Sequence, residues 1–405
     1  MIRNLLRAAL VIVCAALSGM TANAETIALR GGNLYASPEA TMLGDAIIVV
    51  SDGVISAVGK SGDVQIPPDA RVIDCAGKTI VAGFWNSHVH FTESVWKNAA
   101  AAPAAQLTAH MQEMLTRWGF TTVWDLGSDP ADSLPLRRRV SSGEVLGPGI
   151  LLAGSIFPSN GHPAYLPAEM QLPEAATPEA SAKMARGYLG MGLDGMKLFT
   201  GVYKGENNPV VNMDVAIAKA AVDVTHAEGK PVFAHPQNTA GVETVIASGV
   251  DVMAHTVALQ SGYTPEQLAR FKQQGIALTA TLSLFTTIPA PSAMVTRIVE
   301  NVVGQLKSFS DNGGAVLFGT DVGFIKLYDT TLEYELMRRA LSERQVLASL
   351  TTNPAAYFKA AKKGKIEKGF DADLVVLDGD PLTDVRNLAR VATTIRAGQI
   401  IYQKP

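Results

Sequence analysis

Beyond residue 24, the first part of the chain consists of short apolar runs separated by tight turn signals. Residues 46–50 and 54–58 are two such runs, and Asp52-Gly53 stands between them. This pair is typical of a two-residue β-hairpin, because both residues tolerate the positive backbone angles that such a turn requires. The pattern therefore predicts paired strands near the start of the chain.

The same pattern returns at the far end. Residues 373–377, 393–396 and 399–402 are strand-like and are separated by turn signals. Segments of this kind at both ends flank a middle with a different pattern. We expect the two ends, residues 25–78 and 363–405, to pair into one small β-sandwich domain.

The middle, residues 79–362, alternates strand-like runs with helical stretches. One helix start is Thr177-Pro178-Glu179, with a capping hydroxyl before a proline and an acid, and the same arrangement begins at Thr264. Repeated strand–helix units predict a (β/α)8 TIM barrel, an α/β fold whose chemistry lies at the C-terminal ends of its strands. The eight expected strands are 79–86, 121–125, 150–155, 195–199, 231–234, 250–254, 276–282 and 315–320.

Two histidines close the first of these strands. His88 and His90 are two positions apart, and alternate side chains of a strand point to the same face. The two imidazoles can therefore approach one ion. A strand can also carry two histidines by chance, so this spacing alone does not establish a metal site.

Other candidate ligands fall at later strands. Lys197 lies in the fourth, His235 and His255 close the fifth and sixth, and Asp321 follows the eighth. Each has an ordinary structural interpretation by itself, such as a buried histidine, an edge lysine or, for Asp321, a helix N-cap. Together with the two histidines of the first strand they meet at one mouth. Because neutral imidazoles and carboxylates suit zinc and similar divalent ions, the six predict a metal site.

The first 24 residues are typical of a secretory signal peptide. Arg3 and Arg7 precede an apolar run that is too short to span a bilayer, and Ala22-Asn23-Ala24 forms an A-x-A cleavage site. We expect a periplasmic or secreted protein. A small residue normally precedes a lipid-bearing cysteine, and the residue before Cys14 is valine, so a released protein is expected rather than an anchored one.

Composition and charge narrow the function classes. The chain of 405 residues is 47% apolar and 18% charged, which is ordinary for globular proteins. Its formal charge of −3 becomes −5 without Arg3 and Arg7, so no nucleic-acid footprint appears. Cys75 alone remains beyond the leader, and we expect it to be a buried apolar residue.

Three further segments carry a family resemblance. Residues 119–123, 352–355 and 364–374 resemble conserved segments of the amidohydrolase superfamily of metal-dependent barrel hydrolases, over essentially the whole chain beyond the leader. The lysine on strand four, and the short interval between His235 and His255, resemble the prolidase and imidazolonepropionase-like branch. Binuclear members of that branch cleave dipeptides and acyl amino acids.

The resemblance implies a cofactor arrangement and a role for each ligand. It consists of two divalent ions, with zinc expected, and a carbamate on Lys197 that lies between them. His88, His90 and Asp321 would hold the first ion, and His235 with His255 the second. Asp321 would also carry the proton from the attacking water to the departing amine. The expected partner is a small-molecule substrate, and a homo-oligomer is possible.

Loops after other strands are expected to shape the substrate pocket. His162, in the Gly-His segment after strand three, and Tyr203, in the loop after strand four, are candidate substrate contacts. A turn histidine and a packing tyrosine are the structural alternatives.

Several other functions stay open. Deaminases of the superfamily carry a glutamate three residues after the strand-five histidine, where this chain has Asn238, so deamination is disfavoured. A cyclic amidase, a lactonase or a phosphotriesterase could use the same two ions. An exported metal-dependent binding protein is the alternative outside enzymology, although simple capture needs no proton shuttle such as Asp321.

Overall fold

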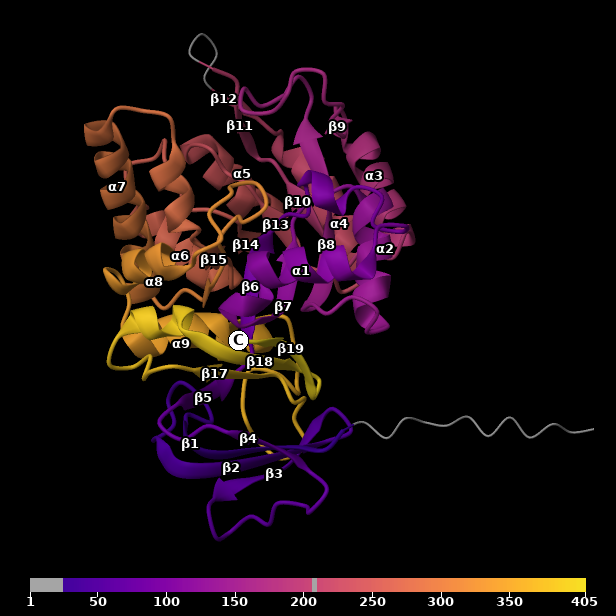
Figure 1. The fold of residues 1–405 in the computed structure, drawn as a ribbon. Helices are drawn as coiled ribbons and strands as arrows, with labels where there is room; N and C mark the ends of the chain where they lie inside the picture. The colour runs from indigo at the N-terminus through magenta and orange to yellow at the C-terminus, as the bar shows by residue number, and fades with distance from the viewer. Residues whose placement is uncertain (1–24, 206–209) are drawn as a thin grey trace, which may run out of the picture.

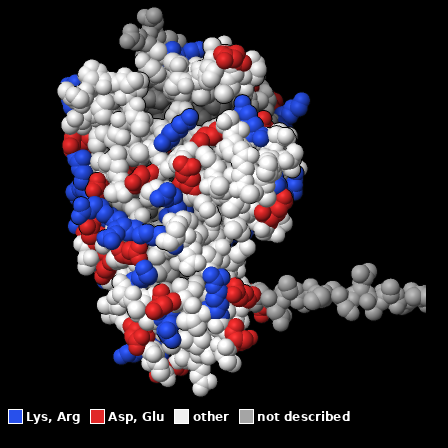
Figure 2. Space-filling view, viewed as in Figure 1, with Lys and Arg blue, Asp and Glu red and all other residues white. Residues whose placement is uncertain are grey.

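The computed structural model describes residues 25–205 and 210–405, which form a barrel above a smaller sheet (Figure 1). The expected signal peptide, residues 1–24, lies outside the described residues. Within the described residues, no helix combines the length and apolar character needed to cross a membrane. On the face shown in Figure 2, acidic and basic side chains are interspersed, and broad areas of the barrel carry neither.

The two chain ends build one sheet, which confirms that they share a small β domain. All eight strands are hydrogen-bonded into one continuous sheet in the order β19-β18-β17-β5-β1-β2-β3, with β4 beside β1. The expected hairpin joins β2 to β3, and its turn residues Asp52 and Gly53 both have positive φ. The strands are β1 (Ile27–Leu34), β2 (Leu43–Ser51), β3 (Val54–Lys60), β4 (Arg71–Asp74), β5 (Thr79–Ala82), β17 (Leu374–Leu377), β18 (Val391–Arg396) and β19 (Gln399–Gln403).

The strand expected over residues 79–86 is two strands, and this corrects the prediction. Residues 79–82 form β5, which pairs with β1 and β17 in the terminal sheet, whereas the barrel begins with β6 (Phe84–Val89). Gly83 lies between the two strands. A Cβ at this position would collide with the side chain of Thr121, so the close approach requires glycine. A continuous apolar run does not show where a chain passes from one sheet to the next.

The expected (β/α)8 barrel is confirmed. Its eight strands are parallel and pair in chain order from β6 to β16. The ring closes where the amides of Ser87 and His90 donate to the carbonyls of Phe318 and Val322, at 2.7 and 2.8 Å. The barrel strands are β6, β7 (Phe120–Asp125), β8 (Gly149–Pro158), β10 (Gly195–Leu198), β13 (Val232–Ala234), β14 (Val252–Met253), β15 (Ala277–Thr279) and β16 (Val316–Leu317).

Helices cover the outside of the barrel. Both predicted helix starts are confirmed, since the hydroxyls of Thr177 and Thr264 accept the backbone N–H of Ala180 and Gln267. Short strands β9 (Glu174–Ala175), β11 (Gly201–Tyr203) and β12 (Val210–Asn212) lie in the loops. The α-helices are α1 (Ala104–Met114), α2 (Pro130–Ser141), α3 (Pro178–Gly190), α4 (Val215–Ala227), α5 (Thr239–Ser248), α6 (Pro265–Gln274), α7 (Ser292–Asp311), α8 (Thr331–Arg338), α9 (Glu343–Leu350) and α10 (Thr352–Tyr357); the 3-10 helices are η1 (Ser94–Trp96), η2 (Thr116–Trp118), η3 (Leu282–Thr287) and η4 (Val385–Ala389).

The terminal sheet closes the N-terminal end of the barrel. Along β17, Leu374 and Val376 enter the core of the sheet domain, whereas Val375 and Leu377 join the core of the barrel. This alternation follows from the two faces of a strand. With one end of the barrel covered by the sheet, the C-terminal ends of its strands remain as the place for a site.

Candidate active site

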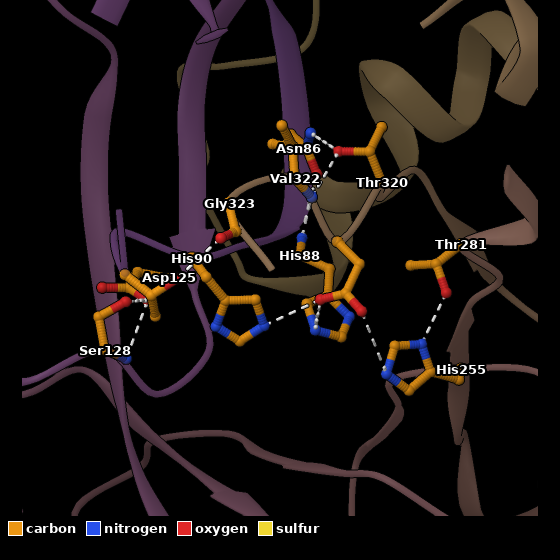
Figure 3. A network of polar contacts seen from close by, with 12 residues as sticks. Asn86, His88, His90, Asp125, Ser128, His255, Thr281, Thr320, Val322 and Gly323 are labelled. Atoms are coloured by element: carbon orange, nitrogen blue, oxygen red, sulfur yellow. Dashed lines mark hydrogen bonds and ion pairs between the residues drawn. The ribbon is translucent and has the colours of Figure 1, made fainter. Parts of the chain in front are cut away.

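Strand β6 carries two histidines into the barrel mouth, as its spacing predicts. The Nε2 atoms of His88 and His90 lie 3.1 and 2.9 Å from one carboxylate oxygen, Oδ1 of Asp321. His88 is fully buried, and the side chain of His90 is 14% exposed. Figure 3 shows both rings turned toward the region that His255 enters from the other side.

Asp321 is held in a left-handed backbone conformation, with φ of 60°. Its amide donates to the carbonyl of His88 at 2.9 Å, which brings the loop after β16 against the end of β6. Gly323 permits this approach, because a Cβ there would overlap the carbonyl of His90. Helix α8 begins only at Thr331, so the interpretation of Asp321 as a helix N-cap is wrong.

His255 follows β14, and its orientation depends on the next strand. Its Nδ1 lies 2.6 Å from the hydroxyl of Thr281, so Nε2 is turned toward Asp321, 3.9 Å from Oδ2. Thr281 also has positive φ, 47°. The buried carboxylate of Glu333 supports this turn by accepting the backbone N–H groups of Leu282 and Ser283, at 2.8 and 2.6 Å.

Lys197 and His235 complete the group from β10 and the end of β13. The ring of His235 lies 4.8 Å from that of His255, and its Nε2 is 3.1 Å from the side-chain oxygen of Gln237. Lys197 is 1% exposed, and its Nζ lies 5.6 Å from the centre of the Phe199 ring. All six predicted ligands therefore project from the C-terminal ends of the barrel strands.

Burial controls the charges of these groups. Burial, followed by the charge of Lys197, lowers the pKa of His88 to about 3 and of His235 to about 4. Burial also lowers the pKa of Lys197 to about 7, against the opposing effect of Asp321. At neutral pH the imidazoles of His88 and His235 are thus neutral, and a large fraction of the Lys197 amine is uncharged.

Asp321 behaves in the opposite sense. Burial by itself would raise the pKa of its carboxyl, but the electrostatic interactions and short contacts with His88 and His90 outweigh it and hold the pKa well below its usual range. The site therefore combines an anionic carboxylate with neutral nitrogen donors. These are the protonation states that metal ligands require.

The unsatisfied atoms of the site fit a metal. Both ring nitrogens of His88 and Oδ1 of Asp321 are buried without a hydrogen-bond partner of good geometry, despite the short distances between them. His88, His255 and Asp321 each place a ligand atom within 4.8 Å of the others. Unpaired buried polar atoms are costly, and divalent ions such as zinc bind through this set of imidazole and carboxylate donors.

Two supporting pairs were not predicted from the sequence. Asn86 donates to the hydroxyl of Thr320 at 2.8 Å, and its side-chain oxygen accepts the amide of His88, which ties β6 to the loop after β16. Ser128 donates to Asp125 at 2.6 Å and accepts the amide of Phe91 at 2.7 Å, so it holds the chain just beyond His90. The sequence did carry a signal for these pairs, because Asn86 and Asp125 are polar residues within otherwise apolar strand-like runs.

The two candidate substrate residues lie in loops over the barrel. Both ring nitrogens of His162 lie near backbone carbonyls of its own loop, those of Pro163 and Met170, at 3.1 and 3.2 Å. Tyr203 ends β11, and its carbonyl accepts the amide of Ala164 at 2.9 Å. These contacts brace the loops, and a substrate contact by either side chain stays a prediction.

The chain belongs to the amidohydrolase family, whose model matches residues 79–401. This confirms the resemblance of the sequence to that group. Family membership and the relatives below make the protein a hydrolase of carbon–nitrogen bonds in small molecules, from a family that is typically metal-dependent. The alternative of a binding protein without turnover is therefore not retained.

Individual relatives agree with this placement. The chain is 22% identical to ochratoxinase of Aspergillus niger over 397 residues, covering 85% of this chain and 79% of that protein. It is 23% identical to imidazolonepropionase of Clostridium tetani, over 89% and 91% of the two chains. In structure it resembles a Xaa-Pro dipeptidase with bound methionine in the active site, with a TM-score of 0.80, 22% identity and coverage of 94% and 100%.

The buried amine of Lys197 predicts a pH-dependent cost to stability. Its pKa falls from 10.5 to about 7 on folding, so folding disfavours the protonated form. Wild-type stability should therefore fall relative to Lys197→Met as pH is lowered from about 10.5 to about 7, and the difference should be constant below that window. Denaturant unfolding of the metal-free proteins, in buffer without carbon dioxide, measures this difference. The exposed Lys219→Met is the control, and an equally pH-independent difference for both variants would contradict the prediction.

Loss of the acceptor for His255 should weaken metal binding. Thr281→Ala removes the hydroxyl next to Nδ1 and should lower zinc affinity by roughly ~10- to 100-fold, as expected for an outer-shell partner of a ligating histidine. Thr281→Ser retains the hydroxyl in the same backbone conformation and should stay close to the wild type. Titration of the metal-free proteins with Zn²⁺ against a competing chelator measures both. Equal zinc affinities of Thr281→Ala and Thr281→Ser would show that the contact between Thr281 and His255 does not contribute to metal binding.

Proposed function

We propose that the protein is an exported binuclear amidohydrolase that cleaves the amide bond of a small peptide or N-acyl amino acid. One observation carries the proposal: buried neutral histidines, an ionised aspartate and a buried lysine converge at the open end of the barrel. Such a group would destabilise an ordinary barrel core, because burying polar atoms without partners costs free energy.

In this proposal His88, His90 and Asp321 hold one ion, and His235 with His255 hold the other. Zinc is the expected metal, since imidazole nitrogens dominate the set. When bound, the ions would polarise the amide carbonyl and lower the pKa of water to generate the nucleophile.

Lys197 would bridge the two ions as a carbamate. A neutral amine nitrogen can form a bond to the carbon of carbon dioxide and lose a proton, which converts the amine into an anionic carbamate. Burial supports this step, because it lowers the pKa of Lys197 to about 7 and so supplies the neutral amine. The neighbouring histidines cannot take this role, since their neutral rings carry no negative charge.

Asp321 is the proton carrier of the proposal. Its low pKa keeps the carboxylate ready to accept a proton from the attacking water, and an amine leaving group must receive a proton as it departs. Asn238 supports amide hydrolysis over deamination. It caps helix α5 by accepting the amide of Gly241 at 2.9 Å, so a structural amide occupies the position of the deaminase acid.

Cyclic amides, lactones and phosphotriesters remain alternative substrates for the same centre. Lactones and phosphotriesters have better leaving groups that depend little on protonation, so they would make less use of Asp321. The similarity to ochratoxinase and imidazolonepropionase supports carbon–nitrogen bonds instead.

Replacement of Asp321 provides the main test. Purified protein lacking residues 1–24 should bind two zinc ions per chain and hydrolyse members of dipeptide and N-acyl amino acid libraries. Asp321→Asn should retain most of the metal, because an amide oxygen can still coordinate, yet lose roughly ~10²- to 10⁴-fold in kcat, as expected for a lost proton-transfer group. Metal analysis and steady-state kinetics give the two readouts.

Asp251→Asn is the matched control. Like Asp321, Asp251 contacts a histidine, His226 at 2.8 Å, and its carboxylate accepts the backbone amide of Val232 at 2.7 Å. It lies just before β14, at the covered end of the barrel. Its replacement should leave kcat within about twofold. The proposal would be overturned if the wild-type protein hydrolysed lactones or phosphotriesters but no member of the dipeptide or N-acyl amino acid libraries.

Export is a separate prediction. Arg3, Arg7 and the A-x-A site at residues 22–24 should direct cleavage, so the mature protein should begin at or near Glu25 in the periplasm or medium. N-terminal sequencing of the protein from each cell fraction checks this. A cytoplasmic product that retains its leader would contradict it.

A further inference from the structure

Two aromatic side chains face each other across the mouth of the barrel. Tyr165 lies in the loop after β8 and Phe324 in the loop after β16. Their ring centres are 5.6 Å apart with planes at 72°, an edge-to-face arrangement. Both remain open to solvent, with exposed fractions of 43% and 42%. We call these two residues the mouth pair.

The mouth pair lies beside the candidate metal ligands. The ring centre of Phe324 is 6.4 Å from that of His90, and their planes are also steeply inclined. Burial of the Tyr165 hydroxyl and then the negative charge of Asp321 raise the pKa of that phenol well above its ordinary value. The effect of Asp321 on this phenol and the contact between Phe324 and His90 both place the mouth pair next to the candidate site.

Both residues are placed by anchored loops. The amides of Phe324 and Ile325 donate to the carbonyl of Asp321 at 3.2 and 3.1 Å, and Ile325 is buried while Phe324 faces outward. On the other side, Ala164, next to Tyr165, donates to the carbonyl of Tyr203. The rings are therefore held in place before any ligand arrives, which reduces the entropic cost of binding.

We propose that the mouth pair is a subsite for an aromatic or large aliphatic side chain on the amine portion of the scissile amide. The inference rests on the proposed function, in which Asp321 delivers a proton to the departing nitrogen. That nitrogen must lie next to Asp321, and Phe324 is three residues further along the same loop. A side chain attached one carbon from the nitrogen would lie against the exposed surfaces of the two rings.

The chemistry of the mouth pair agrees with this choice of substrate. Contact between these exposed aromatic rings and an apolar side chain removes apolar surface from water, which lowers the free energy of the complex. Single exposed apolar residues are common on proteins, but two in ring contact beside a candidate active site form a defined binding surface.

A matched substrate series tests the inference. The zinc-loaded protein without its leader is assayed on N-acetyl derivatives of glycine, alanine, leucine, phenylalanine, glutamate and lysine, which differ only in the amine portion. The wild type should prefer phenylalanine and leucine over glycine in kcat/KM. Phe324→Ala and Tyr165→Ala should each reduce the preference for phenylalanine over glycine by roughly ~10-fold, whereas Tyr165→Phe, which keeps the ring, should retain it.

Two controls separate this inference from the proposed function. Met191→Ala removes an exposed apolar side chain, 58% exposed, at the end of α3, and should leave the preference unchanged. Calorimetric titration of the inactive Asp321→Asn protein with N-acetylphenylalanine and N-acetylglycine reports binding without turnover, and the additional Phe324→Ala change should abolish the difference between them.

The outcomes are distinguishable. If the series is hydrolysed but the preference survives both alanine substitutions, the subsite is wrong and the proposed function stands. If no member of the series is hydrolysed, yet Phe324→Ala still removes selective binding of N-acetylphenylalanine, the subsite stands and the proposed amide hydrolysis fails. Absence of both turnover and selective binding overturns both.

Discussion

The closure of the barrel between β6 and the loop after β16 is the constraint on which the rest of the site depends. Asp321 donates its amide to the carbonyl of His88, and its carboxylate oxygen lies about equally far from the Nε2 atoms of His88 and His90. A positive φ at Asp321 and the absence of a side chain at Gly323 make this approach possible. Strained non-glycine backbone persists only where surrounding contacts hold it, and here these contacts are the hydrogen bonds that close the barrel.

Burial then gives the assembled residues their chemistry. The same desolvation that keeps the imidazoles of His88 and His235 neutral also brings the amine of Lys197 to a pKa of about 7. Asp321 keeps its negative charge, because the two nearest histidines oppose the effect of burial. An enclosed group of neutral donors around one anion is poorly stable by itself, and bound cations would relieve it. Stability and metal affinity are thus opposed at this end of the barrel.

The supporting residues connect the site to the outer helices. Glu333 of α8 holds the turn in which Thr281 orients His255, and Ser128 holds the chain beyond His90. The loops that carry Tyr165 and Phe324 rise from the same strand ends. The metal ligands and the mouth pair are consequently positioned by one set of strand termini. This arrangement lets loop residues change the substrate preference without moving the ligands.

Local patterns along the chain were sufficient to predict the barrel, the small β domain built from both chain ends and the six candidate ligands. Strand periodicity and the order of polar residues are local properties, and in a parallel barrel the C-terminal ends of all strands meet at one mouth. Other features became visible only in the folded chain: the passage from β5 to β6 at Gly83, the left-handed conformation of Asp321, the roles of Asn86, Thr281 and Glu333, and the contact between Tyr165 and Phe324. Each of these depends on which segments approach one another in space, and spacing along the chain carries no information about that approach. The same holds for the charges, because the pKa of Lys197 or Asp321 follows from burial and neighbours rather than from residue type.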